Sequence, residues 1–222
     1  MGSQVPPSPL DSLIASLDRE RRNELWVLVN IPGRYQLASK RKLNGERREF
    51  ACRIVNLSAS AMALAAPVLG PVGERAIVYT DALGQLHGAI LRQMSTGFVM
   101  SIVADEQTRE RVATKVSWLA KQKDEPETSE NRRHARVVPK NPTATILLAD
   151  GSLVSCLVID YSASGAAVSA DLDPPVGTPL AVGKMVGRVV RRFSEGFAVQ
   201  FAEAIPLGEI ERRLTISPAQ GP

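Results

Sequence analysis

An internal repeat constrains the fold of this chain more than any other feature of its sequence. Residues 53–61 (RIVNLSASA) and 157–165 (LVIDYSASG) match at a constant separation of 104 positions, and Ser-Ala-Ser recurs in place. The same separation carries Cys52 onto Cys156. A match that extends beyond one short string indicates duplication, so we expect two copies of one domain in tandem.

The later part of the repeat follows at a shorter separation. Residues 88–92 (GAILR) and 187–191 (GRVVR) lie 99 positions apart, which implies five extra residues in the first copy. We expect these extra residues in the turn at residues 80–84. The chain then divides into an N-terminal helical segment, a first copy, a linker, a second copy and a tail, at residues 1–22, 23–122, 123–131, 132–215 and 216–222.

Short apolar runs separated by turn residues dominate the second copy, a pattern typical of β-strands. The runs are Thr143–Leu148, Leu153–Ile159, Ala166–Ser169, Val186–Arg191 and Phe197–Phe201. Between the first two, Asp150 and Gly151 form a hairpin turn signal. Strands this short, at this spacing, predict a small β-barrel for each copy.

Helical spacing of apolar residues follows the strands of each copy. The apolar positions are Val112, Val116 and Leu119 in the first copy and Leu207, Ile210 and Leu214 in the second. We expect each helix to close the open end of its barrel. A further helix is predicted before the first copy, where Ser8 as N-cap and Pro9 introduce apolar residues at helical spacing.

Composition indicates an ordinary globular protein and narrows the functions open to it. Apolar residues make up 44% of the 222 residues and charged residues 23%. Aromatic residues, at 5%, are too few to line a stacking channel for single-stranded nucleic acid, and the net charge of +4 favours an anionic partner only weakly. Two isolated histidines and two cysteines form no metal-binding pattern, so no metal and no cofactor is expected.

The sequence also predicts which of several residues are buried and which lie at the surface. Cys52 and Cys156 occupy matching strand positions and are expected to be buried apolar residues rather than a redox pair. Trp118 is expected in the core, and the basic residues at 40–42 and 47–48 at the surface. The chain has no apolar run long enough to cross a bilayer, and its start lacks the pattern of a secretory leader. We therefore expect a cytoplasmic protein without membrane insertion.

Two short motifs flank the first hairpin of the second copy. Arg132 and Arg136 form an RxxxR element, and residues 160–165 (DYSASG) read as DxSxxG. The ordered pair, inside a β-rich repeat, resembles the signature of the PilZ family, and Arg133 either joins the site or faces water. The resemblance implies six-stranded barrels that bind cyclic di-GMP. The expected fold is therefore mainly β, with two tandem six-stranded PilZ-type barrels, each followed by an α-helix, and a short N-terminal helix.

The chemistry of cyclic di-GMP suits these residue types. A guanidinium matches a phosphate or the O6 and N7 edge of guanine, and a carboxylate matches the N1–H and N2 donors of guanine. By similarity to the family, Arg132 and Arg136 grip phosphate and guanine, Asp160 reads a guanine edge, and Ser162 helps to hold the ligand. Gly165 is expected to supply a positive φ or a close approach of the main chain to the ligand.

The first copy departs from this pattern. It keeps Asn56 and Ser58 but has Ala61 where the second copy has glycine. The separation of 104 positions places Leu28 and Pro32 opposite the two arginines of the RxxxR element. We therefore expect the first copy not to bind the ligand on its own and to serve as a structural or partner-facing module.

The leading interpretation is a receptor that converts the level of cyclic di-GMP into a change of domain arrangement. Because the arginines lie at the end of a linker, the ligand is expected to order them and to change how the barrels are held. By family resemblance, the output reaches motility, exopolysaccharide synthesis or biofilm behaviour through a protein partner that the sequence does not identify. No enzyme is expected, since no combination of nucleophile, base and orienting group is found.

Two other classes stay open. One is a ligand-independent adaptor whose arginines bind an acidic protein. The other is a nucleic-acid binder, which the scarce aromatics and modest charge disfavour. The site is compatible with one ligand molecule or an intercalated pair. The leading helix can pack on its own barrel or on a second subunit, so a homodimer also stays open.

Overall fold

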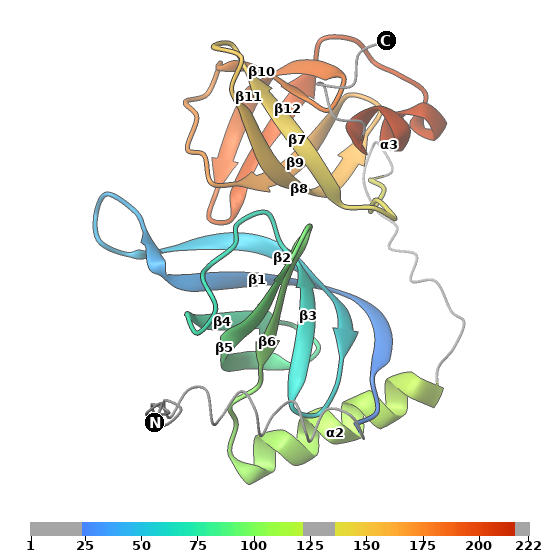
Figure 1. Cartoon of the computed structure of the whole chain (residues 1–222). Helices are drawn as coiled ribbons and strands as arrows, with labels where there is room; N and C mark the ends of the chain where they lie inside the picture. The colour runs from blue at the N-terminus through green and yellow to red at the C-terminus, as the bar shows by residue number, and fades with distance from the viewer. Residues whose placement is uncertain (1–23, 122–135, 216–222) are drawn as a thin grey trace, which may run out of the picture.

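The computed structural model describes residues 24–121 and 136–215, which form two closed antiparallel barrels of six strands, each followed by a helix (Figure 1). The first barrel comprises β1 (Val27–Arg41), β2 (Arg47–Leu57), β3 (Ala61–Ala65), β4 (Arg75–Thr80), β5 (Gly84–Met94) and β6 (Gly97–Ser101), followed by α2 (Glu106–Lys121). The second comprises β7 (Thr143–Leu148), β8 (Leu153–Ser162), β9 (Gly165–Ala170), β10 (Pro179–Val182), β11 (Met185–Phe193) and β12 (Gly196–Phe201), followed by α3 (Leu207–Thr215).

The two barrels share one topology. Around the first barrel the order is β1-β2-β3-β6-β5-β4, and around the second it is β7-β8-β9-β12-β11-β10. The predicted duplication and the mainly β fold are confirmed. The predicted N-terminal helix falls within residues 1–23, outside the described residues, so the structure gives it no support. No helix among the described residues has the length and apolar character that crossing a bilayer requires.

Strand β8 runs three residues beyond its predicted end at Ile159. The ladder with β9 pairs Val158 with Val168 and Asp160 with Ala167, so Ile159 is an extra residue in a β-bulge. Pairing then continues to the end of the strand. The bulge therefore keeps Asp160 within the strand. Strand β10 was missed by the apolar pattern because it has only four residues and begins with a proline.

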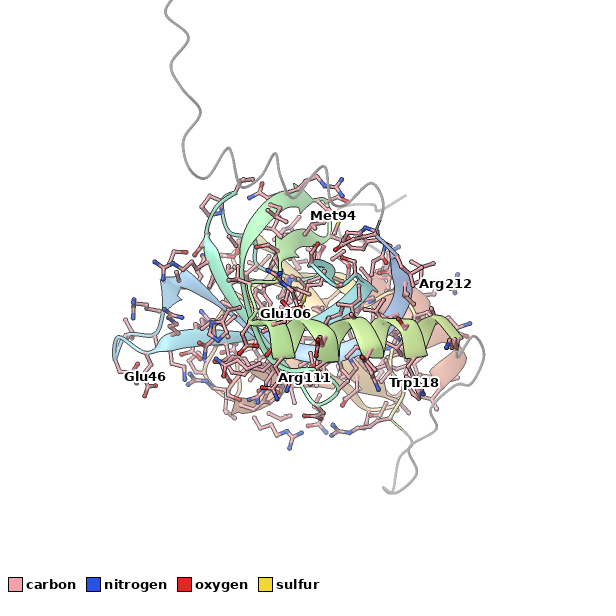
Figure 2. The ribbon with its side chains drawn as sticks, turned by 90° about the horizontal axis from the view of Figure 1, so that it is seen from below. Glu46, Met94, Glu106, Arg111, Trp118 and Arg212 are labelled. Atoms are coloured by element: carbon pink, nitrogen blue, oxygen red, sulfur yellow. The ribbon has the colours of Figure 1, made fainter. Side chains whose placement is uncertain are left out.

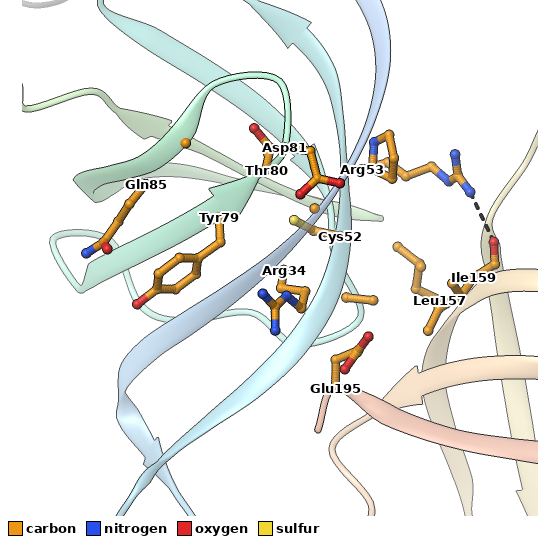
Figure 3. Close-up of a pocket in the computed structure, with 14 residues that line it drawn as sticks. Arg34, Cys52, Arg53, Tyr79, Thr80, Asp81, Gln85, Leu157, Ile159 and Glu195 are labelled. Atoms are coloured by element: carbon orange, nitrogen blue, oxygen red, sulfur yellow. Dashed lines mark hydrogen bonds between the residues drawn. The ribbon is translucent and has the colours of Figure 1, made fainter. Parts of the chain in front are cut away.

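The five extra residues of the first copy extend the β4–β5 hairpin, as predicted. This hairpin runs on to the pair Thr80 with Gly84, whereas the equivalent β10–β11 hairpin closes at Val182 with Met185. The end of the longer hairpin lines a cavity of about 450 Å³ that Leu157, Ile159 and Glu195 of the second barrel also line (Figure 3).

Each barrel encloses its own apolar core, which its helix covers. From α2, Val112 and Val116 are buried in the first core, and Leu119 packs against it. From α3, Ile210 and Leu214 are buried in the second core. The prediction that Leu207 shares this buried face is wrong, because it begins the helix and is 38% exposed. Both cysteines are buried and free, as expected.

Trp118 is not a core residue. It is 46% exposed on the outer side of α2, which Figure 2 views from outside. It lies two positions after the buried Val116, which turns its side chain by about 200° around the helix axis. The ammonium group of Lys115 lies 4.0 Å from the centre of its indole ring. The ring therefore stacks on a cation at the surface.

The barrels meet through an apolar patch bordered by ion pairs. Ala51, Val55 and Ala65 of the first barrel contact Leu157 and Ile159 of the second. At the border, Asp171 accepts hydrogen bonds from Lys40 Nζ at 2.6 Å and from Arg48 Nη1 at 3.1 Å. These two members of the basic cluster expected at the surface therefore bind the second barrel.

Candidate functional site

Arg136 and Asp160 form an ion pair on the outside of the second barrel. Arg136 Nη1 lies 3.1 Å and 3.3 Å from the two carboxylate oxygens of Asp160, and the side chains are 39% and 24% exposed. The backbone sets this proximity, because Val137 and Tyr161 exchange two N–H to carbonyl hydrogen bonds at 2.8 Å and 2.9 Å. The structure thus brings together two of the predicted site residues.

The turn from β8 to β9 adds the serine and the glycine of the predicted motif. Ser162 pairs with Gly165 across the turn, and the Ser162 hydroxyl lies 3.4 Å from that of Ser164. The same hydroxyl lies 3.5 Å from the Gly165 carbonyl oxygen, which is a long contact. Ser162 therefore keeps hydrogen-bonding capacity for a ligand.

Gly165 is required by the barrel wall rather than by a turn conformation. It is not among the described glycines with positive φ. A Cβ built on it would lie 2.4 Å from the carbonyl oxygen of Val199 on the neighbouring strand β12. The expectation of a positive φ is therefore wrong, and the close approach is to the barrel's own main chain.

A groove runs over these residues along the outer face of the barrel. It consists of two adjoining cavities of about 270 Å³ and 260 Å³ that share Arg136, Asp160, Ala167 and Arg191. A groove of this size suits a nucleotide-sized ligand. Arg191, on β11, adds a second guanidinium that the site prediction missed. Arg92 stands at the same place in the first copy, and an arginine that both copies carry does not by itself indicate a ligand site, so the repeat held no signal for it.

The remaining predicted arginines, Arg132 and Arg133, lie outside the described residues. Their place in the ligand site stays a prediction.

Glu211 on α3 accepts hydrogen bonds from groups next to the site. Its Oε1 accepts hydrogen bonds from the backbone N–H groups of Lys140 at 2.6 Å and Asn141 at 3.1 Å. Its Oε2 accepts one from the Tyr161 hydroxyl at 3.3 Å. Burial, with Glu211 as the second cause, raises the pKa of Tyr161. The carboxylate therefore connects α3 both to the segment after Arg136 and to Tyr161, the residue after Asp160.

The first barrel has no arginine at the position of Arg136 among its described residues. The bridge that places Arg136 has its counterpart in the pair Val27 with Leu57, and the residue before that pair is Trp26. The sequence separation had placed Pro32 there, which is wrong, because the β1–β2 hairpin is longer than the β7–β8 hairpin. Gln36 pairs with Glu49, whereas Leu147 pairs with Leu153, the equivalent of Glu49, so the first copy has seven more residues in this hairpin. Together with the register shifts at the start of each barrel, including one of one residue after Leu28, this moves the equivalent of Arg136 from Pro32 to Trp26.

Other positions of the first barrel also differ from the second. The Ser60 hydroxyl donates to Glu24 Oε2 at 2.7 Å, so a carboxylate borders the turn that follows Asn56 and Ser58. The Asn56 side-chain oxygen accepts the N–H of the next residue at 3.1 Å. A tryptophan and a carboxylate here suit an anionic nucleotide poorly.

Comparison with known proteins gives one family match. The sequence model of the PilZ domain matches residues 130–215. No curated protein matches the chain.

Solved structures that match the chain at low similarity include three bacterial proteins. PlzA of Borreliella burgdorferi, in complex with c-di-GMP, is 14% identical, with 92% of this chain and 98% of that chain covered and a TM-score of 0.28. The Bacillus subtilis inhibitor of motility MotI/DgrA is 12% identical, with coverages of 85% and 94% and a TM-score of 0.28. YcgR of Escherichia coli, in complex with c-di-GMP, is 12% identical, with coverages of 93% and 87% and a TM-score of 0.24. Scores this low support no transfer of function. By its family match, this chain contains a PilZ domain, which spans residues 130–215 and includes the second barrel.

Proposed function

We propose that the second barrel is a receptor for cyclic di-GMP. The observation that carries the proposal is the Arg136–Asp160 pair, which lies in a groove of nucleotide size on a PilZ domain. A guanidinium and a carboxylate side by side offer both kinds of group that guanine and phosphate require.

The proposal gives each side chain of the groove a role. Arg136 and Arg191 supply positive charge for phosphate and for the O6 and N7 edge of guanine. Asp160 accepts the N1–H and N2 donors of guanine, and its pairing with Arg136 already holds the carboxylate in place. Ser162 contributes a hydroxyl at the turn. Arg132, which precedes the described part of this barrel, adds a further guanidinium.

The groups in the groove favour binding over catalysis. A guanidinium and a carboxylate paired with each other hold an anion and a base edge, but do not activate a nucleophile. The proposed output is a change in how the two barrels are held, which alters the choice of protein partner and regulates motility, exopolysaccharide synthesis or biofilm behaviour. A cytoplasmic location follows from a receptor for an intracellular nucleotide.

Calorimetric titration with cyclic di-GMP tests the proposal, with GMP and cyclic di-AMP as ligand controls. Arg136→Ala, Asp160→Ala and Arg191→Ala each remove a charged group, so each is expected to weaken binding by about ten- to a hundredfold. Arg92→Ala is the matched control, because it removes the equivalent arginine of the first barrel and is expected to leave binding unchanged.

Saturable, guanine-specific binding that collapses in the second-barrel variants supports the receptor. If the wild-type protein does not bind cyclic di-GMP in the same titration, the receptor proposal is refuted and the ligand-independent adaptor is favoured. Small-angle scattering with and without ligand tests the output separately, since a change in the separation of two barrels alters the radius of gyration.

A further inference from the structure

The β-bulge that carries the ligand aspartate is held by the first barrel. Ile159 is the extra residue of the bulge, directly before Asp160. Its carbonyl oxygen accepts a hydrogen bond of 3.1 Å from Arg53 Nη2, which reaches across from β2 (Figure 3). The contact thus joins one barrel to the backbone next to the site residue of the other.

Arg53 occupies an environment that is costly for a guanidinium. It is only 5% exposed, and its other hydrogen bond, from Nη1 to the Asn30 side-chain oxygen at 3.1 Å, also goes to a neutral group. Its Nε is buried without a partner, and no ion pair among the described residues includes it. Burial lowers its pKa. Because a buried charge without a carboxylate is destabilising, the fold alone gives no reason for arginine here.

The second barrel provides a direct comparison. Leu157 stands at the position equivalent to Arg53 in the repeat, and it fills the same interface as an apolar residue. An aliphatic side chain therefore satisfies the packing requirement at this position of the barrel. What arginine adds is the hydrogen bond to the bulge.

A second contact links the same strand of the first barrel to the other wall of the groove. The fully buried Ser169 hydroxyl accepts the Ala51 N–H at 2.9 Å and donates to the Glu195 carbonyl oxygen at 2.6 Å. Glu195 and Ile159 both line the ligand groove and the cavity between the barrels. Strand β2 is therefore connected to two walls of the groove.

We propose that Arg53 is a positioning residue for the ligand site: it fixes the Ile159 carbonyl and thereby Asp160, so the first barrel sets the affinity of the second for its ligand. The inference rests on the proposed function, because it assigns Asp160 to ligand binding. By thermodynamic linkage, a ligand whose affinity depends on this contact strengthens the contact by the same factor. The first barrel, which lacks an arginine at the position of Arg136, then acts as a regulatory domain for the second.

The test compares Arg53→Leu, Arg53→Lys and Arg34→Leu in the full chain. The leucine variant copies the residue that the second barrel carries, and the lysine variant keeps a donor for the Ile159 carbonyl. Arg34 is the matched control, because it lines the same cavity but pairs with Glu49 of its own barrel at 3.3 Å. Cyclic di-GMP affinity is measured by calorimetry at two salt concentrations, and the unfolding midpoint by thermal scan.

We expect Arg53→Leu to bind about three- to tenfold more weakly than wild type, with an unfolding midpoint that is unchanged or raised. Arg53→Lys is expected to recover most of the affinity, and Arg34→Leu to match wild type. The salt dependence of binding should be the same in Arg53→Leu as in wild type, since Arg53 acts through the backbone. If the leucine variant does not fold, Arg53→Met, which keeps the length of the side chain, replaces it.

Three results would overturn the inference. Wild-type affinity in Arg53→Leu would show that the contact does not reach the site. A weaker salt dependence in Arg53→Leu would make Arg53 a direct phosphate ligand instead. A loss of affinity accompanied by a lower midpoint, without recovery in Arg53→Lys, would reduce its role to stability. Absence of binding by wild type is a distinct outcome, because it removes the proposed function itself.

Discussion

The substitution Gly165→Ala tests whether the close approach of two strands, rather than a turn conformation, requires the glycine of the DxSxxG motif. The added methyl group would lie 2.4 Å from the Val199 carbonyl oxygen, a main-chain atom of the adjacent strand. Ordinary contact needs about 1 Å more, so β9 and β12 have to separate. Overpacking of this kind costs about 1–3 kcal/mol. For a domain of under 100 residues, 2 kcal/mol lowers the unfolding midpoint by about 8–16 °C.

Differential scanning calorimetry measures this shift, and tryptophan fluorescence assigns it to a barrel. Both tryptophans, Trp26 and Trp118, belong to the first half of the chain, so fluorescence follows the first barrel. We expect the calorimetric transition of the second barrel to fall by more than the fluorescence transition. Gly151→Ala is the control, because Gly151 has a φ of +85° and nothing within 4 Å of a Cβ. It should cost only about 1 kcal/mol, through conformation alone.

A Gly165→Ala protein as stable as wild type would refute this reasoning, because the strands would then separate without cost. The first barrel shows that the fold accepts alanine here when the strand spacing allows it. Ala61 occupies the equivalent position and is fully buried beside Ser101.

Three further predictions concern single groups. Glu211→Gln should lower the stability of the second barrel by about 1 kcal/mol in urea unfolding, since the charged acceptor of two backbone N–H groups is lost. The same substitution should lower the pKa of Tyr161 in an absorbance titration, and an unchanged titration would contradict the contact. Burial raises the pKa of the thiols of Cys52 and Cys156, so neither should react with a thiol reagent at pH 8 until the chain unfolds; rapid labelling of the native protein would contradict their burial. Burial also raises the pKa of Tyr35 and Tyr161, so folding stability should be fully present below about pH 10 and fall as the pH rises further, measured as the urea midpoint against pH.

The fold could be predicted because a duplicated pattern is visible without knowledge of long-range contacts. The strand Thr143–Leu148 has the predicted bounds, and the extra residues lie in the predicted hairpin. The register of the first strand could not be predicted, because similarity between the copies is lost there. The longer β1–β2 hairpin and the register shifts at the start of each barrel place Trp26, not Pro32, at the position of Arg136.

The site could be predicted only in part. Residue types and spacing predicted that Arg136 and Asp160 share one site, and the structure brings these two side chains together, since short motifs carry that information within one barrel. The contact of Arg53 with the bulge depends on which faces of two barrels meet, and no local pattern of the sequence states this. Trp118 was misplaced for a related reason. Helical spacing defines a buried stripe, but its edge depends on how the barrel end fits the helix.

The interface described above has an evolutionary consequence, because the same strand of each repeat, β2 and β8, contributes to it. Two identical barrels joined through one strand would form a closed two-fold dimer, with the same patch used twice. Gene fusion turns such a dimer into one chain, and the partner is then present at an effective concentration in the millimolar range. Once the partner is guaranteed, the two copies of the patch need no longer be identical. Arg53 and Leu157 differ in this way, since the first makes a polar contact with the other barrel and the second an apolar one.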